Sequence, residues 1–225
     1  MQTFNITKKS EVEKTFRVAK ISAEFDYDVD ESEEHFEGVI EIPSEWNIGL
    51  IVGGSGTGKS TIAKELFNKE LIKGFRYRRK SVIDDMPRNC SVDEITRAFY
   101  SVGFGSVPSW IKPYNVLSNG EKMRVDLARA VLERDFIVFD EFTSVVDREV
   151  AKTACIALSK AIRRDNKKFV AVGCHYDVID YLQPDWVFDT NTMKSFFVSR
   201  QDRSKSSTSD NAVLAIGESS SVITI

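Results

Sequence analysis

Short, continuously apolar segments alternate with helical patterns along the central part of the chain. The three segments are Ile48–Val52, Phe136–Phe139 and residues 169–174. Such an unbroken apolar run is typical of a strand that is buried on both faces, and strands of this kind form parallel sheets with helices between them. The pattern therefore predicts an α/β core built on a parallel sheet.

The N-terminal part of the chain shows a two-residue period instead. Phe36, Ile40 and Ile42 alternate with more polar positions, which predicts a half-exposed antiparallel strand. We expect its partner strand near residues 16–25. Together the two strands predict a small antiparallel β-subdomain ahead of the parallel sheet.

The segment between the first two apolar runs is expected to be mostly helical. A strand is predicted at residues 81–83 and a helix at residues 93–102, followed by a loop that contains Gly and Pro. We interpret the residues from about 84 to 134 as a short helical subdomain. Residues 1–200 then form one domain, and the serine-rich residues 201–225 are predicted to be a disordered tail.

Composition narrows the class of protein. The chain has 225 residues, of which 42% are hydrophobic, enough for one globular core. Its net charge of -3 argues against general coating of nucleic acid, although basic and aromatic residues interleave in a local run at 73–80. Three separated cysteines indicate neither a disulfide framework nor a zinc site. Reduced cytosolic thiols are the simplest interpretation, so we expect a cytoplasmic protein. Without a long apolar run, we expect no direct insertion into the membrane.

A glycine-rich loop follows the first apolar run directly. Residues 53–60 read G-G-S-G-T-G-K-S, and an apolar-periodic helix begins after them. This spacing lets successive backbone N–H groups point at an anion, and the helix N-terminus adds a favourable dipole. The loop therefore predicts a site for nucleotide phosphates, with Lys59 on the β- and γ-phosphates and Ser60 on Mg²⁺. The nucleotide-binding residues that we expect here are Gly53, Gly54, Ser55, Gly56, Thr57, Gly58, Lys59, Ser60 and Thr61.

Two acidic residues follow the second apolar run. Asp140 and Glu141 come directly after Phe136–Phe139, and the carboxyl ends of parallel strands are where such sheets bind ligands. Asp140 is predicted to hold Mg²⁺, and Glu141 to polarise the attacking water. A polar loop would produce the same pair of acids, but the phosphate loop upstream favours the functional interpretation.

A second anion site is predicted between these two motifs. The segment 117–121 reads L-S-N-G-E and begins a helix, with Ser118 and Glu121 at the spacing of an ordinary capping box. A serine hydroxyl, a glycine and a helix N-terminus can also bind an anion. In its position the segment resembles the signature motif L-S-G-G-Q of ATP-binding-cassette (ABC) ATPases, from which it keeps the leucine, the serine and the second glycine.

The rest of the motif order fits the same family over roughly residues 15–199. The segment 144–147 follows the two acids, and His175 follows the third apolar run. The resemblance implies an ABC-type P-loop NTPase core, with ATP and Mg²⁺ as ligands. It implies that His175 contacts the γ-phosphate, so that the expected catalytic residues are Lys59, Glu141 and His175.

The resemblance also implies a partner for the site. In this family two cassettes pair head to tail, so Ser118 and Gly120 of one chain would act on the ATP bound by a second chain. The adenine is stacked on an aromatic residue upstream of the phosphate loop, for which Tyr27 and Phe25 are the candidates.

Two departures from the family pattern weigh against a transporter. No glutamine occurs between the phosphate loop and the signature segment, where transporter cassettes have one that links the nucleotide site to the membrane domain. Asp84 or Asp85 could supply an oxygen there instead. The interval between these two motifs is also short, so the subdomain that docks membrane partners looks trimmed.

Residues 109–114 and Trp46-Asn47 resemble a soluble bacterial and phage group in which the cassette is often fused to a predicted acetyltransferase. We therefore expect a soluble, non-transporter ABC-type ATPase that acts as an ATP-driven homodimer clamp, with any further activity on a partner chain. Two alternatives stay open. One is the ATPase subunit of a transporter with a separate membrane chain; the other is a nucleic-acid-acting ATPase of repair, translation or phage defence, supported locally by the basic run at 73–80.

Overall fold

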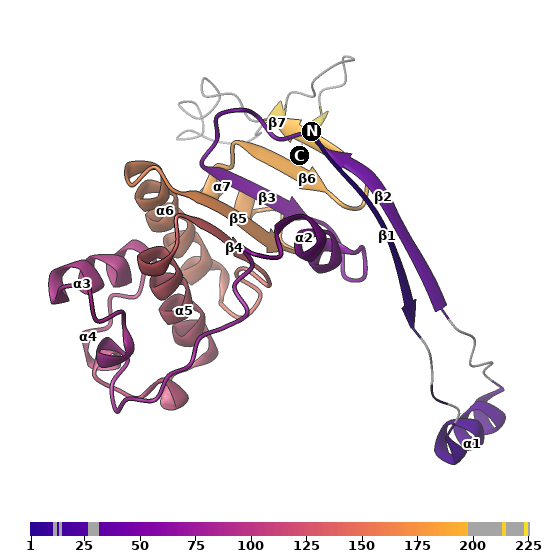
Figure 1. The fold of residues 1–225 in the computed structure, drawn as a ribbon, viewed down its shortest axis with the longest axis horizontal. Coiled ribbons are helices and arrows are strands. Elements are labelled where there is room, and N and C mark those ends of the chain that lie inside the picture. The colour runs from indigo at the N-terminus through magenta and orange to yellow at the C-terminus, as the bar shows by residue number, and fades with distance from the viewer. Residues whose placement is uncertain (11–12, 14, 27–31, 198–212, 215–222, 225) are drawn as a thin grey trace.

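The computed structural model describes residues 1–10, 13, 15–26, 32–197, 213–214 and 223–224 (Figure 1). Its central layer is a five-stranded sheet with the strand order β4-β5-β3-β6-β7. Neighbouring strands are parallel except at the β6–β7 pair, which is antiparallel. The strands are β3 (Ile48–Val52), β4 (Phe136–Phe139), β5 (Lys168–Gly173), β6 (Trp186–Asp189) and β7 (Lys194–Phe197). The α/β prediction is confirmed.

The apolar runs are unbroken because other elements of the fold pack against both faces of this sheet. Every residue of β3 is buried. Leu50 belongs to a large core that includes side chains of the helices α5 (Asn119–Glu133) and α6 (Arg148–Arg164). Ile51 belongs to a second core, with side chains of α2 (Lys59–Phe67) and of the N-terminal hairpin of β1 (Gln2–Ser10) and β2 (Ser32–Ile40). Because successive side chains of a strand point to opposite faces, both sets of positions must be apolar.

The remaining elements connect the strands or extend from them (Figure 1). The helices are α1 (Phe16–Phe25), α2 (Lys59–Phe67), α3 (Val92–Ser101), α4 (Val107–Trp110), α5 (Asn119–Glu133), α6 (Arg148–Arg164) and α7 (Val178–Leu182), with single 3-10 turns η1 (Ile83–Asp85) and η2 (Tyr114–Val116). A short pair of antiparallel strands, β8 (Val213–Leu214) and β9 (Ile223–Thr224), falls within the predicted tail. Most of that tail lies outside the described residues.

The N-terminal hairpin corrects one prediction. The strand β2 (Ser32–Ile40) pairs with β1 (Gln2–Ser10), and residues 16–25 form α1 instead of the expected partner strand. The Thr15 hydroxyl caps this helix by accepting a hydrogen bond from the Val18 N–H, at 3.3 Å, and Asp26 ends it in the left-handed region. These caps at both ends stabilise a helix at the residues predicted to be the partner strand.

The predicted strand at residues 81–83 is also wrong. Val82 is buried, but its N–H donates to the Lys112 carbonyl, within the helical region, and no strand pairs with it among the described residues. The turn η1 follows at once because Asp85 accepts hydrogen bonds from the backbone N–H groups of Arg78 and Arg79. The predicted helix at 93–102 is confirmed as α3, which begins with a complete capping box.

In the described part of the chain, no helix combines the length and the apolar character that a membrane crossing requires.

Candidate functional site

The phosphate loop lies between the end of β3 and the start of α2, as predicted. Gly56 and Gly58 have φ angles of 80° and 83°, which favour glycine. A Cβ atom on Gly58 would also lie 2.6 Å from Cε1 of Phe36, which comes from the hairpin. Among the residues that the structure describes, no side chain caps the N-terminus of α2, so its first N–H groups are available to an anion.

Lys59 is folded back onto its own loop. Its half-buried ammonium donates a hydrogen bond to the Gly54 carbonyl oxygen. A phosphate bound in the loop would offer this ammonium a charged acceptor in place of a neutral one, and charge-assisted hydrogen bonds are the stronger kind. The geometry is therefore compatible with the predicted role of Lys59 on a phosphate.

The fold brings Ser60, at the start of α2, into contact with Asp140, which directly follows β4. The Ser60 hydroxyl donates to Oδ1 of Asp140 at 3.0 Å, although the two residues lie 80 positions apart. A hydroxyl and a carboxylate are hard oxygen donors, and Mg²⁺ commonly binds through one or two such protein groups together with water and phosphate oxygens. The pair fits the predicted Mg²⁺ site. No cluster of three or more His, Cys, Asp or Glu residues suited to a metal occurs within the described ranges.

Glu141 is exposed at the carboxyl edge of the sheet and has a φ angle of 54°. Its backbone is held on both sides: its N–H donates to Asp140 Oδ1 at 2.9 Å, and its carbonyl accepts from the Ser144 hydroxyl at 2.7 Å. The next N–H, that of Phe142, donates to the Val172 carbonyl of β5 at 2.9 Å. A non-glycine residue held with positive φ at the end of a strand is a common feature of functional sites.

His175 lies just after β5, at the same edge of the sheet, and is half-buried. Burial lowers its pKa first, the nearby Arg148 guanidinium lowers it further, and the Glu141 carboxylate opposes both effects. Since Glu141 acts on His175 electrostatically, the fold brings these two predicted catalytic residues near one another. The lowered pKa keeps the imidazole neutral at pH 7.

We predict that Arg148→Ala raises the pKa of His175. The substitution removes a positive charge and frees Asp177, whose carboxylate pairs with Arg148. In the wild type, His175 binds its proton more tightly in the unfolded chain than in the folded chain, because folding lowers its pKa. The His175 contribution therefore lowers stability as the pH falls below about 6.5 and vanishes above it. Titration of the imidazole signals by NMR would test this, with exposed His35 as the reference; an unchanged His175 curve would contradict it.

Ser118 and Gly120 lie at the start of α5, in the predicted capping box. The Ser118 N–H donates to Glu121 Oε2 at 2.9 Å, and the Glu121 N–H donates to the Ser118 hydroxyl at 3.3 Å. A Cβ atom on Gly120 would lie 2.9 Å from Cγ1 of Val146, so this glycine allows α5 to approach the segment after the acids. No hydrogen bond or ion pair of the described residues joins Ser118 or Gly120 to the phosphate loop of the same chain.

The predicted adenine-stacking residue Tyr27 lies outside the described residues. Phe25, the other candidate, is 70% exposed at the end of α1. Asp84 and Asp85 are the predicted substitutes for the missing glutamine. Asp84 accepts from the Ser81 hydroxyl, and Asp85 accepts from the backbone N–H groups of Arg78 and Arg79, so both carboxylates have local partners.

Sequence reasoning missed the turn that follows β6. The Gly54 N–H donates to Asn191 Oδ1 at 3.1 Å, and the Thr57 and Thr190 hydroxyl oxygens are 2.5 Å apart. This turn is far from the phosphate loop in sequence and carries no recognisable motif, so no signal in the sequence alone points to it.

Solved structures resemble this arrangement over most of the chain. The dimeric post-hydrolysis structure of the ATP-binding cassette MJ0796, bound to ADP and Pi, matches 83% of this chain and 92% of its own with a TM-score of 0.57 and 15% identity. A second dimeric MJ0796 structure, described as a bacterial ABC transporter cassette, gives a TM-score of 0.55 over the same shares. The chain has the fold of an ABC ATPase cassette.

Sequence relatives support the same family. The human mitochondrial iron-sulfur clusters transporter ABCB7 is 27% identical over 70% of this chain, and the match covers 26% of that protein. The energy-coupling factor transporter ATP-binding protein EcfA1 of Staphylococcus aureus is 26% identical over 63% of this chain and 66% of its own length. The chain thus spans about a quarter of the ABCB7 relatives. No family model matches the sequence. Together these likenesses support the prediction of an ATP-hydrolysing ABC cassette.

Proposed function

We propose that this chain binds ATP with Mg²⁺, hydrolyses it, and pairs head to tail with a second copy as a nucleotide-driven clamp. The observation that carries the proposal is the contact between Ser60 and Asp140, beside Glu141 and His175, at one edge of the sheet. A phosphate-binding loop, a pair of hard oxygen donors, a carboxylate and a neutral imidazole are the groups that phosphoryl transfer to water requires.

Each residue has a defined task in this proposal. Lys59 releases the Gly54 carbonyl and donates to the phosphates. Ser60 and Asp140 would hold Mg²⁺, which would offset the negative charge of the phosphates. Glu141 accepts a proton of the attacking water, and His175, kept neutral by burial, donates a hydrogen bond to the γ-phosphate.

The position of the signature segment favours a pair of chains. Ser118 is exposed, and its hydroxyl interacts with Glu121 of its own helix and not with the phosphate loop. An anion site at the start of α5 would therefore serve a nucleotide held by another molecule. In that arrangement Ser118 and the dipole of the 15-residue helix α5 stabilise charge on the γ-phosphate of the partner.

We expect Glu141→Gln to form a dimer with Mg-ATP and to remain a monomer with Mg-ADP or without nucleotide. The substitution removes the general base but keeps the side-chain size, so ATP binding should persist while hydrolysis slows by about a hundredfold or more. Solution mass by light scattering measures the outcome. Adding Ser118→Arg should abolish the dimer.

A matched control separates the signature from helix capping. Ser91 caps α3 with the same complete capping box that Ser118 forms at α5. Ser91→Arg in the Glu141→Gln background loses about the same capping energy, roughly 1 kcal/mol, and should still dimerise. If the Glu141→Gln chain binds ATP as a monomer, the homodimer proposal fails.

The names of the relatives favour a second candidate. ABCB7 is named as a transporter and EcfA1 as the ATP-binding protein of a transporter, so the second candidate for this chain is the ATPase subunit of a separate membrane chain. Such a subunit would use the same residues for ATP. A monomer that binds ATP would direct the search to such a heterologous partner.

A further inference from the structure

A polar network connects the phosphate loop to the segment that carries His175. The Gly54 N–H donates to Asn191 Oδ1 at 3.1 Å, and Asn191 Nδ2 donates to the Tyr176 hydroxyl at 2.7 Å. Asp189 completes the network: its Oδ1 accepts from the Tyr176 hydroxyl at 3.1 Å and from the Asn191 N–H at 2.8 Å. Tyr176 directly follows His175 in the chain.

The network requires an amide at position 191. The Asn191 side chain uses its oxygen toward one motif and its nitrogen toward the other, and an amide is the short side chain that offers an acceptor and a donor on two separate atoms. Its orientation is determined by these partners, since the opposite flip would place two N–H donors face to face. An aspartate would lose the donor and place a negative charge beside the site of the phosphates.

A second contact holds the same turn to the loop. The Thr57 and Thr190 hydroxyl oxygens are 2.5 Å apart, and Thr190 also donates to the Val52 carbonyl at 3.2 Å. A Cβ atom on Gly53 would lie 2.2 Å from the Thr190 hydroxyl, so the loop and the turn are in close contact. The turn therefore has a fixed position, from which Asn191 reaches Gly54.

His175 is anchored on its other side as well. Asp177, two residues further on, pairs with Arg148 at the start of α6. The short segment 175–177 is thus tied through Tyr176 to the phosphate loop and through Asp177 to α6. A movement of the loop relative to His175 would have to break the hydrogen bonds of Asn191.

We propose that Asn191 and Tyr176 are positioning residues that fix the distance between the phosphate loop and His175, so that one bound γ-phosphate meets both. The inference rests on the proposed ATP hydrolysis for its catalytic consequence. Its structural part, the mechanical link between the two motifs, holds without nucleotide.

The link is tested first without nucleotide. In Asn191→Ala, hydrogen exchange at the Gly54 amide should become about tenfold faster, because its acceptor is gone. The His175 ring signals in the NMR spectrum should shift in the same variant, although residues 175 and 191 are not neighbours in sequence. Thr192→Ala, an exposed substitution in the same turn, should change neither. Unchanged His175 signals in Asn191→Ala would overturn the link.

The positioning role is tested by ATP turnover. Asn191→Ala and Tyr176→Phe should each lower kcat/KM about tenfold, the equivalent of one or two hydrogen bonds. In a His175→Ala background the same substitutions should cost less than about twofold, because nothing remains to be positioned. An equal loss in both backgrounds would overturn the role. A wild-type chain that turns over no ATP would instead refute the proposed function, and the exchange experiment would still decide the link.

Discussion

Replacement of Lys59 by methionine is expected to lower kcat/KM for ATP by at least about a hundredfold, the scale seen when one preorganised charge or donor is removed from a transition state. Lys59 is the one cationic residue of the loop 53–60. Methionine keeps most of the side-chain length while removing the charge and the hydrogen bond to the Gly54 carbonyl. Steady-state ATP hydrolysis measures the loss of turnover, and equilibrium binding of a fluorescent ATP analogue measures the loss of nucleotide affinity.

A control on the same helix distinguishes a site effect from a change in α2. Lys64 is exposed on α2, one turn beyond the loop, and Lys64→Met removes the same charge there. We expect this variant to hydrolyse ATP like the wild type. If Lys59→Met kept more than about a tenth of wild-type kcat/KM, Lys59 would have no charge-stabilising role and the assignment of the loop would be wrong.

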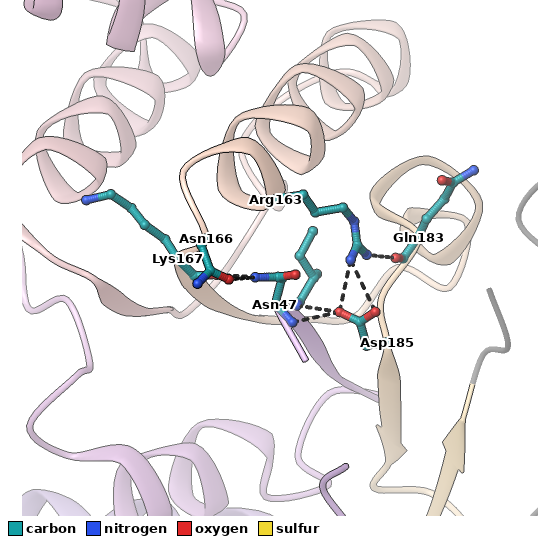
Figure 2. Close-up of polar contacts among 7 residues, drawn as sticks. Asn47, Arg163, Asn166, Lys167, Gln183 and Asp185 are labelled. Carbon is teal, nitrogen blue, oxygen red and sulfur yellow. Dashed lines mark hydrogen bonds and ion pairs between the residues drawn. The ribbon is translucent and has the colours of Figure 1, made fainter. Parts of the chain in front are cut away.

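The second large effect concerns stability. Asp185→Ala is expected to lower the free energy of unfolding by about 3 kcal/mol, because it leaves buried partners without their acceptor. Asp185 Oδ2 accepts from the backbone N–H groups of Asn47 and Ile48, both at 2.8 Å, and both carboxylate oxygens accept from Arg163 Nη1 at 3.1 Å (Figure 2). Arg163 also donates to the Gln183 carbonyl at 2.6 Å.

This cluster joins three elements at the edge of the sheet opposite the nucleotide site. It holds the start of β3, the end of α6 and the segment before β6, as Figure 2 shows. Urea unfolding followed by tryptophan fluorescence would measure the loss. The control is Asp135→Ala, which removes the almost fully exposed partner of Lys167 and should cost less than about 1 kcal/mol. Equal effects in the two variants would contradict the structural role of Asp185.

Asn47 shows why a motif can be recognised without its role being understood. The pair Trp46-Asn47 contributed to the family resemblance, with no function attached to it. In the fold, the Asn47 side chain donates to the Lys167 carbonyl at 3.0 Å and its backbone N–H donates to Asp185, so this residue aligns β3 with β5 and β6. Its identity is explained by strand alignment and not by nucleotide chemistry.

Features that depend on neighbours in the chain could be predicted from the sequence alone. The bounds of β3 and β4, the phosphate loop between β3 and α2, and the capping box of Ser118 all agree with the structure. These features follow from local rules. An apolar run predicts a strand that is covered on both faces, and glycines permit a left-handed backbone. A serine before a helix accepts a hydrogen bond from the backbone N–H three residues later.

Other features depended on the tertiary structure. The strand partner of β2 is β1, whereas residues 16–25 form a helix capped by Thr15; the apolar alternation in residues 36–42 predicts a strand there but does not say which segment pairs with it. The contact between Gly54 and Asn191 spans 137 positions, and Asp185 reaches Asn47 across 138. Such pairs meet because a parallel sheet places the ends of distant strands along one edge, and that placement depends on strand order. The sequence by itself determined the apolar strands, the glycine-rich loop after β3 and the two acids after β4, and it predicts a phosphate site there; only the folded sheet decided which distant side chains hold these segments in position.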